Sequence, residues 1–558
     1  TLRGKSGRTY KSKRPFVELL GIPYGNTTEG EHRFTRSQDV SLPLSPTDEN
    51  GVFDATKQGP CCPQLNSSST CSSRQNENCL TLNIYTLMQT ENAPKKLLPV
   101  IVHIHGGSFT VGSSDDYNGN RLLERDVVVA SLNYRLGVLG LFCLNIKEAP
   151  GNAGMYDVVQ ALRFIKKHVH HFGGDPDRIT ITGCSAGSVI VTQLMASPMI
   201  RGEELFHRAI AMSGTALNEW GTSSSKDAEK VSLKIAQLVG CYDPTNSSSK
   251  VEVLDCMRQV SASQFVESLG QYQGTELSLG PLAIVPILPV IQVASDGPMF
   301  LDEHPLAVLS RKKQANIPLM MGTTRHDGSF ALALQYGAYL EPNNYVQDSY
   351  FLKTKLVPKA LQVLGIHDKT GAVFDALAHQ YLGKDAKNSG NFTQMIPGLT
   401  DLHSVFFFKA AAYKTLLLHS RLQNESFWYS FDYSGKYTQY SSQVYPGNNP
   451  IRGGISHGDD LIYIFTIPQC EDLSPDDQVV SDRMVDYWVN FASNGNPNIE
   501  GDGGSSNLHE NEGWPSYSEE HPGFVAIGVK DQFIPGIPSD YWQGCSCELW
   551  PELTLGQS

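Results

Sequence analysis

One serine stands in a sequence context that suits a nucleophile. The segment Gly183-Cys184-Ser185-Ala186-Gly187 has the pattern G-x-S-x-G and follows the β-branched run at 178–182. The apolar stretch at 189–195 that comes next is expected to be helical. A sharp turn from strand to helix would raise the middle side chain above the sheet, and the flanking glycines would avoid collisions of a Cβ atom with neighbouring elements. Ser185 is therefore a candidate nucleophile, although a serine that caps a helix would have a similar local sequence.

A serine hydroxyl is a poor nucleophile at neutral pH, so it needs a base, and the base needs an orienting carboxylate. After a strand-turn-helix of this kind, the acid and then the histidine follow along the chain. Asp327 comes after the predicted strand at 317–321, at a carboxyl end where parallel sheets gather catalytic groups. His457 lies in the glycine-flanked loop 453–458, which leaves its imidazole outside helix and sheet. Taken singly, Asp327 reads as a turn residue before a glycine and His457 as a surface-loop histidine.

Two consecutive glycines, Gly106 and Gly107, follow the predicted strand at 98–104. Their backbone N–H groups can turn inward and, with the N–H of Ala186, form an oxyanion hole. The loss of one such donor typically costs about 2.7–4 kcal/mol of transition-state stabilisation. A tight turn would also use two glycines. Two glycines, then serine, acid and histidine along the chain nevertheless point together to acyl transfer through a covalent intermediate.

Apolar, strand-like runs alternate with amphipathic segments over most of the chain. This pattern predicts an α/β fold with a large, mostly parallel central sheet flanked by helices. The predicted strands are residues 98–104, 127–132, 179–182, 209–212, 317–321 and 427–431. Several are hydrophobic throughout, as strands covered on both faces should be. The runs 16–20 and 82–85 suggest a small antiparallel addition near the N-terminus, and we expect one domain over residues 1–558, because no repeat or long linker divides the chain.

Charge and hydropathy exclude two classes of partner. The net charge of −13 argues against nucleic acid and against anionic membrane surfaces, because both select basic proteins. The longest apolar stretch, at 281–294, contains prolines and is too short to span a bilayer. We therefore expect no nucleic-acid partner and no integral membrane segment. The sequence leaves the oligomeric state open.

Cysteines and glycosylation sequons gather around polar loops. One loop holds Cys61, Cys62, Cys71 and Cys79, a second is bracketed by Cys241 and Cys256, and Cys545 and Cys547 lie near the end. Candidate glycosylation sites are Asn26, Asn66, Asn246, Asn391 and Asn424. This combination favours an oxidising secretory compartment, so we expect a secreted, extracellular glycoprotein. Zinc is the alternative for the first cluster, but the spacing of its cysteines fits no usual set of zinc ligands, and we expect no metal.

In sequence, the chain resembles the type-B carboxylesterase and cholinesterase family over nearly its whole length. The matching motifs lie at 21–24, 33–34, 78–83, 105–107, 152–187, 213–214, 453–461 and 494–498. The resemblance implies an α/β-hydrolase fold, a Ser185–Asp327–His457 triad and an oxyanion hole from Gly106, Gly107 and Ala186. It also implies the disulfides Cys62–Cys79 and Cys241–Cys256. We add Cys61–Cys71 and Cys545–Cys547 as candidate pairs, and expect Cys143 and Cys184 to be buried thiols.

The chain departs from the family at informative positions. Cys184 stands where the family usually has Glu before the nucleophile, and Asp327 replaces the usual Glu of the triad. Juvenile hormone esterases resemble the chain at Arg33-Phe34 but have Gln at the position of Cys184, which weakens that assignment. The loop between Cys62 and Cys79 has no aromatic residue. Because quaternary ammonium groups are recognised by aromatic faces, this argues against a cholinesterase.

These observations predict a secreted serine carboxylesterase that acts on a small-molecule ester through an acyl-enzyme on Ser185, without cofactor. Two alternatives stay open. The first is a non-catalytic, cholinesterase-like protein that binds an apolar ligand in the gorge. The second is a lipase-type hydrolase of lipid esters.

Overall fold

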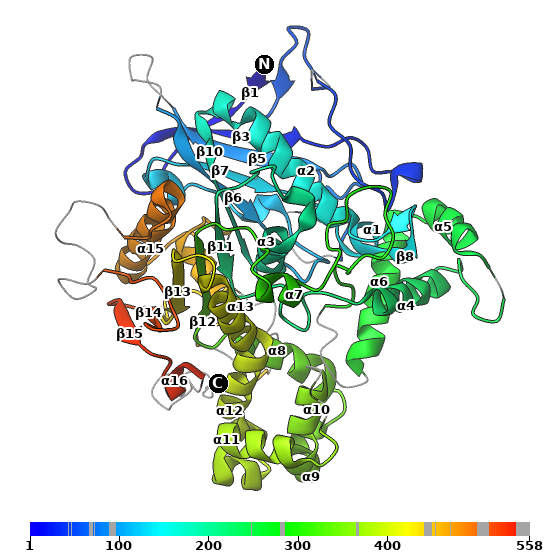
Figure 1. Cartoon of the computed structure of the whole chain (residues 1–558), viewed down its shortest axis with the longest axis vertical. Coiled ribbons are helices and arrows are strands. Elements are labelled where there is room, and N and C mark those ends of the chain that lie inside the picture. The colour runs from blue at the N-terminus through cyan, green and yellow to red at the C-terminus, as the bar shows by residue number, and fades with distance from the viewer. Residues whose placement is uncertain are drawn as a thin grey trace.

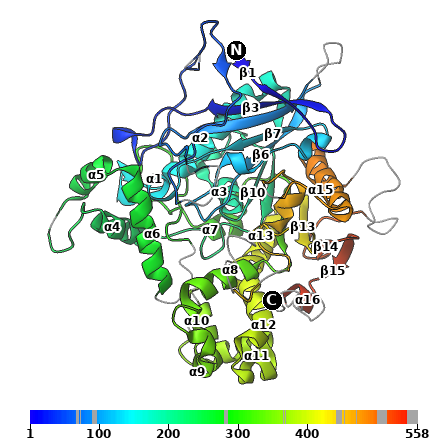
Figure 2. The ribbon, with the colours of Figure 1, turned by 180° about the vertical axis from the view of Figure 1, so that it is seen from behind.

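The computed structural model describes residues 1–42, 44–45, 47–65, 71, 73–88, 96–246, 248–278, 285–363, 366, 368–439, 449–451, 454–468, 470–498 and 513–542. Candidate positions Asn66, Cys545 and Cys547 lie outside these ranges. Figures 1 and 2 show the chain from opposite sides.

Within the described residues, the main sheet has eleven strands in the order β15-β14-β13-β12-β11-β10-β6-β7-β5-β3-β2. The seven strands from β14 to β7 run parallel, and antiparallel strands extend both edges. Their bounds are β2 Lys5–Arg8, β3 Pro15–Pro23, β5 Thr81–Leu87, β6 Leu98–Ile104, β7 Val128–Leu132, β10 Gly174–Cys184, β11 Arg208–Met212, β12 Leu319–Thr324, β13 Ser426–Phe431, β14 Gly523–Ile527 and β15 Gln532–Pro535. Short pairs are formed by β1 Leu2–Arg3 with β4 Phe53–Asp54 and by β8 Cys143–Ile146 with β9 Ala149–Pro150. The predicted α/β class, the parallel strands and the antiparallel addition near the N-terminus are confirmed.

Helices cover both faces of this sheet. On one face, Val100 and Val102 of β6 join a cluster with residues of α2 (Ala153–His168) and α3 (Ala186–Ala196). On the other, the intervening Ile101 joins a cluster that contains Met484 and Trp488 of α15 (Pro475–Asn494). Because successive side chains of a strand point to opposite faces, a continuous apolar run is what two covered faces require.

The helices begin and end as follows: α1 Gly137–Leu141, α2 Ala153–His168, α3 Ala186–Ala196, α4 Ser225–Leu238, α5 Lys250–Gln259, α6 Ala262–Ser278, α7 Pro305–Ser310, α8 Gly328–Gln335, α9 Ser349–Thr354, α10 Leu356–Val363, α11 Ala372–Ser389, α12 Phe392–Ser404, α13 Ala410–Ser420, α15 Pro475–Asn494 and α16 Ser539–Trp542. Helices α8 to α12 enclose an apolar cluster of their own and form the end of the molecule opposite the N-terminal strands (Figure 1). Among the described residues, no helix combines the length and the apolar character needed to cross a bilayer.

The disulfides agree with the sequence-based expectations. The structure contains Cys62–Cys79 and Cys241–Cys256, which the family resemblance implies, and also Cys61–Cys71. Cys143 and Cys184 are buried thiols, as expected, and Cys470 is a third. Four of the candidate glycosylation sites, Asn26, Asn246, Asn391 and Asn424, are exposed.

Candidate active site

Ser185 occupies the sharp turn between β10 and α3. Its backbone has φ 59° and ψ −126°, a region that L-residues with a Cβ rarely adopt. The Ser185 N–H donates a hydrogen bond of 2.9 Å to the carbonyl of Met212, the last residue of the neighbouring strand β11. The strained turn therefore holds Ser185 at the carboxyl edge of the parallel sheet.

Close packing explains the glycines around this turn. A Cβ on Gly187 would lie 2.1 Å from the carbonyl oxygen of Ile104, at the end of β6. A Cβ on Gly106 would lie 2.6 Å from the carbonyl oxygen of Cys184 and 3.1 Å from the Cβ of Ser185. The loop that contains Gly106 and Gly107 thus lies directly against the Ser185 turn, while Ala186 is the first residue of α3.

Asp327 and His457 are joined by a buried hydrogen bond. Asp327 lies between β12 and α8, and its Oδ1 is 2.6 Å from Nδ1 of His457. Both side chains are inaccessible to solvent. Oδ2 of Asp327 accepts hydrogen bonds from the Ser213 hydroxyl at 2.6 Å and from the Thr324 N–H at 3.2 Å. Since a carboxylate only accepts, Nδ1 of His457 carries the proton of this bond, which directs Nε2 away from Asp327.

An aromatic cavity lies beside Ser185. It contains about 280 Å³ of empty space, its open mouth included, and is lined by Ser108, Ser185, Trp220, Val285, Phe330, Ala331, Phe407 and Phe408. The rings of Phe330 and Phe408 also pack on the His457 imidazole, with centroids at 5.1 and 4.7 Å. The same two side chains therefore contact the histidine and border the space in front of the serine.

A π-helical turn at Val405–Lys409 brings Phe407 and Phe408 to this cavity. The carbonyl of Phe407 accepts a hydrogen bond of 2.9 Å from Nε1 of Trp220 and a second one from the side-chain amide of Asn218. A π turn widens the helix by one residue and often marks a functional position. Here the indole N–H links two walls of the cavity to each other.

Burial favours the neutral forms of ionisable groups close to Asp327. Burial raises the pKa of Asp459 to about 8 and that of Asp460 to about 7, and Asp327 contributes to the shift at Asp460. The Tyr429 hydroxyl donates to Asp460 at 3.0 Å. Burial, together with the nearby Asp460 and Asp327, raises the pKa of Cys184 well above its usual value. Because a thiolate is the reactive form of cysteine, the buried Cys184 thiol is a poor nucleophile.

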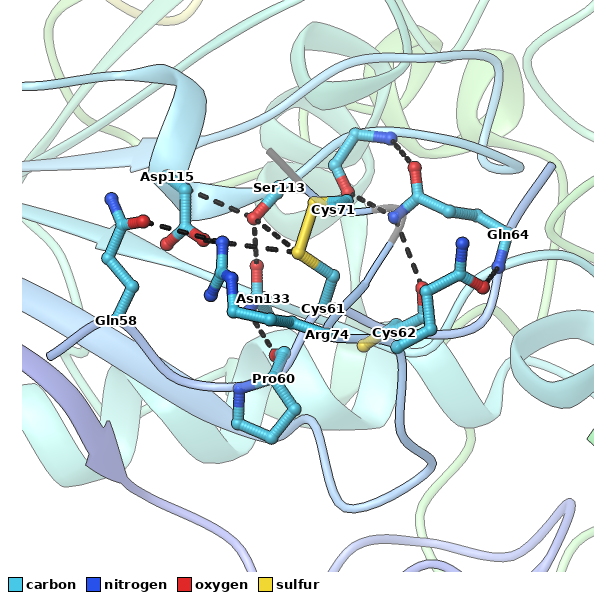
Figure 3. Close-up of a disulfide and its surroundings, with 12 residues drawn as sticks. Gln58, Pro60, Cys61, Cys62, Gln64, Cys71, Arg74, Ser113, Asp115 and Asn133 are labelled. Atoms are coloured by element: carbon cyan, nitrogen blue, oxygen red, sulfur yellow. Dashed lines mark hydrogen bonds and ion pairs between the residues drawn. A yellow bond between two sulfur atoms is a disulfide. The ribbon is translucent and has the colours of Figure 1, made fainter. Parts of the chain in front are cut away.

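The loop that follows Gly106 and Gly107 is tied to residues beside the disulfides Cys61–Cys71 and Cys62–Cys79; Gln64 and Arg74 are drawn in Figure 3. The Gln64 side chain donates to the carbonyl of Gly112 at 2.9 Å and accepts from its N–H at 2.8 Å. Arg74 forms an ion pair of 2.7 Å with the buried Asp115. Cys61 and Cys71 lie near Asp115, but their sulfur atoms are bonded to each other, so they are not the thiolates that a zinc ion would need.

Comparison with known proteins decides the family. A profile of the carboxylesterase family matches residues 1–541. The chain belongs to this family. A juvenile hormone esterase of Tribolium castaneum is 31% identical over 96% of this chain and 87% of its own length. Carboxylesterase 4A of Bos taurus is 29% identical over 93% of this chain and 88% of its own, and neuroligin-2 of Rattus norvegicus is 27% identical over 97% and 65%, respectively. The expected class of enzyme, a carboxylic ester hydrolase, agrees with this membership.

The sequence alone does not identify all the residues that build the site. It shows Ser213 only as part of a motif and gives no signal for the aromatic wall of Trp220, Phe330, Phe407 and Phe408. Apolar side chains give the same local pattern whether they fill a core or line a cavity. The serine next to a glycine at the end of a predicted strand was the one available signal for Ser213.

Proposed function

We propose that this esterase works through a covalent acyl-enzyme on Ser185, with His457 as general base and Asp327 as its orienting acid. The observation that carries the proposal is the buried Asp327–His457 hydrogen bond, whose imidazole packs on the same two phenylalanines that border Ser185. Burial strengthens such a bond, because no water competes for the carboxylate.

The first half-reaction transfers the acyl group to the enzyme. Nε2 of His457 takes the Ser185 proton while Oγ attacks the ester carbonyl carbon, and the N–H groups of Gly106, Gly107 and Ala186 stabilise the oxyanion. The C–O bond to the alcohol then breaks, and His457 returns the proton to the leaving alcohol. In the second half-reaction, water loses a proton to His457 and attacks the acyl carbon. The acid leaves and Ser185 regains its proton.

The cavity supports a preference for esters with a short acyl group. The space in it that water-sized groups can occupy is only about 20 Å³, far below the range of about 300–1,000 Å³ that is usual for pockets for drug-sized ligands. Four aromatic side chains and the Trp220–Phe407 hydrogen bond form its walls. A long acyl chain would have to displace them.

The described disulfides and the exposed sequons support secretion. Disulfides persist in oxidising compartments and are rare in the cytosol. Asparagine glycosylation needs the same secretory route and an accessible side chain.

Turnover of p-nitrophenyl esters from acetate to palmitate tests the mechanism and the acyl preference together. We expect the highest kcat/KM with the short chains and complete loss in Ser185→Ala. Turnover that persists in this variant contradicts the acyl-enzyme on Ser185. A rise of activity only above the aggregation concentration of the substrate would favour the lipase-type alternative.

A further inference from the structure

The segments that carry Asp327 and His457 are joined by a second connection beside their hydrogen bond. The His326 N–H donates to the carbonyl of Ile455 at 3.0 Å. In return, the Ile455 N–H donates to Nδ1 of the His326 imidazole, also at 3.0 Å. His326 and Ile455 are both 1% exposed, so this pair is shielded from water. His326, which directly precedes Asp327, therefore holds Ile455, which lies two positions before His457.

A serine pair continues this connection on the other side. Ser329 and Ser456 lie with their hydroxyl oxygens 3.0 Å apart, and the Ser329 N–H donates to the His326 carbonyl at 2.9 Å. Ser456 directly precedes His457, and Ser329 follows Asp327 by two residues. The two cross-links therefore bracket the Asp327–His457 bond.

The His457 loop depends on such contacts for its position. It lies outside helix and strand, between Gly454 and Gly458, whose φ angles are 74° and 77°. Glycine-flanked segments have wide conformational freedom, so tertiary contacts must select one conformation. The His326 imidazole supplies a contact that the backbone alone cannot, because its Nδ1 accepts the Ile455 N–H.

We propose that His326 is a positioning residue of this esterase: its Nδ1 accepts the Ile455 N–H and thereby fixes the loop that aims His457 at Asp327 and Ser185. The inference rests on the proposed triad. The backbone hydrogen bond from the His326 N–H to the Ile455 carbonyl would remain in any variant at this position. The side-chain acceptor Nδ1 can therefore be tested separately. A shift of about 1 Å in a catalytic group can lower the rate on the order of 100-fold.

The test compares His326→Leu, which removes the acceptor, with His326→Asn, whose Oδ1 stands the same number of bonds from the backbone as Nδ1. Each purified full-length variant is assayed for kcat and KM with p-nitrophenyl acetate. Proton NMR follows the downfield resonance of the His457 Nδ1–H that bonds Asp327, assigned by its loss in His457→Gln. Thermal melting monitors folding. If the Leu variant does not fold, His326→Gln replaces it, because the Gln side-chain oxygen lies one bond farther from the backbone than Nδ1 does.

We expect His326→Leu to lower kcat on the order of 10- to 100-fold with little change in KM, and to shift or broaden the downfield resonance. His326→Asn should recover most of kcat and the wild-type resonance. A folded Leu variant with wild-type kcat and resonance would overturn the proposal, as would an Asn variant as impaired as Leu. If wild type lacked Ser185-dependent turnover, the proposed mechanism would fail, and the resonance alone would still decide whether His326 positions the loop.

Discussion

The hydroxyl of Ser213 donates a hydrogen bond of 2.6 Å to Oδ2 of Asp327, the carboxylate oxygen that does not face His457. Ser213 follows directly on β11, and β11 lies next to β12, the strand that leads to Asp327. Together with the Thr324 N–H, this hydroxyl prevents rotation of the carboxylate, so that Oδ1 stays directed at the imidazole.

Ser213→Ala should therefore lower kcat/KM while the chain remains folded. A hydrogen bond to a charged group contributes about 1.5–3 kcal/mol, and if about half of this reaches the transition state the loss is about 4- to 13-fold. The matched control is Ser197→Ala, which removes another buried hydroxyl that donates at 2.6 Å, here to the carbonyl of Phe300. It should lower the melting temperature similarly and leave kcat/KM near wild type. Equal activity losses in both variants would speak against a specific role of Ser213.

Asp327→Asn should nearly abolish turnover. The amide cannot hold the imidazole in the required tautomer and charge state, and a comparable change in a serine protease costs about 10⁴-fold in kcat. Asp327→Glu should retain more activity than the Asn variant but less than wild type, because the additional methylene must fit into a site fully closed to solvent. Steady-state kcat for the three proteins tests this order. An Asn variant with more than a tenth of wild-type kcat would argue against Asp327 as the acid.

Phe407→Ala should widen the acyl preference. The side chain lines the cavity next to Ser185, and one additional methylene in an apolar pocket changes specificity by about 1–3 kcal/mol. We expect the ratio of kcat/KM for butyrate over acetate to rise at least about tenfold. Phe374→Ala, in the cluster formed by α8 to α12, is the control and should leave this ratio unchanged. An unchanged ratio in Phe407→Ala would mean that acyl groups bind elsewhere.

Protein stability should depend on pH through buried histidines and aspartates with opposite signs. Burial lowers the pKa of His103 to about 3 and those of His105, His403 and His419 to about 4. The unfolded chain binds protons at these four positions below pH 6.5, whereas the folded chain does not. The contribution of the four histidines to the free energy of unfolding therefore falls as the pH drops from 6.5 to 4. Asp459 and Asp460 keep protons in the folded state up to pH 8 and 7, which the unfolded chain releases above about 3.8. The contribution of these two aspartates to the free energy of unfolding is therefore lost as the pH rises toward 8.

Four histidines outweigh two aspartates between pH 4 and 6.5, so the free energy of unfolding should rise with pH across this range. Above pH 6.5 the raised pKa values of the two aspartates dominate, and the free energy of unfolding should fall again toward pH 8. Denaturant unfolding at half-unit intervals from pH 4.5 to 8.5 should therefore show a maximum close to 6.5. Stability that increases steadily from pH 6.5 to 8.5 would contradict this assignment.

The sequence predicts the parallel core of this molecule well, because strands covered on both faces must be apolar throughout, as in β6 and β13. It also points to Ser185, Asp327 and His457 through their order along the chain and the family motifs around them, although each residue taken singly has another common use. It does not predict that Phe330 and Phe408 meet at His457, since α8 and the π turn come together only through tertiary packing. The raised pKa values of Asp459 and Asp460 likewise depend on burial, which the sequence of an acidic loop does not reveal.

The most direct test of the central claim is labelling with a fluorophosphonate, followed by mass spectrometry of the modified peptide. We predict a single adduct on Ser185, formed at a rate that parallels ester turnover, with neither adduct nor turnover in Ser185→Ala. An adduct on another residue, or an active chain that is not labelled at Ser185, would contradict the proposed acyl-enzyme.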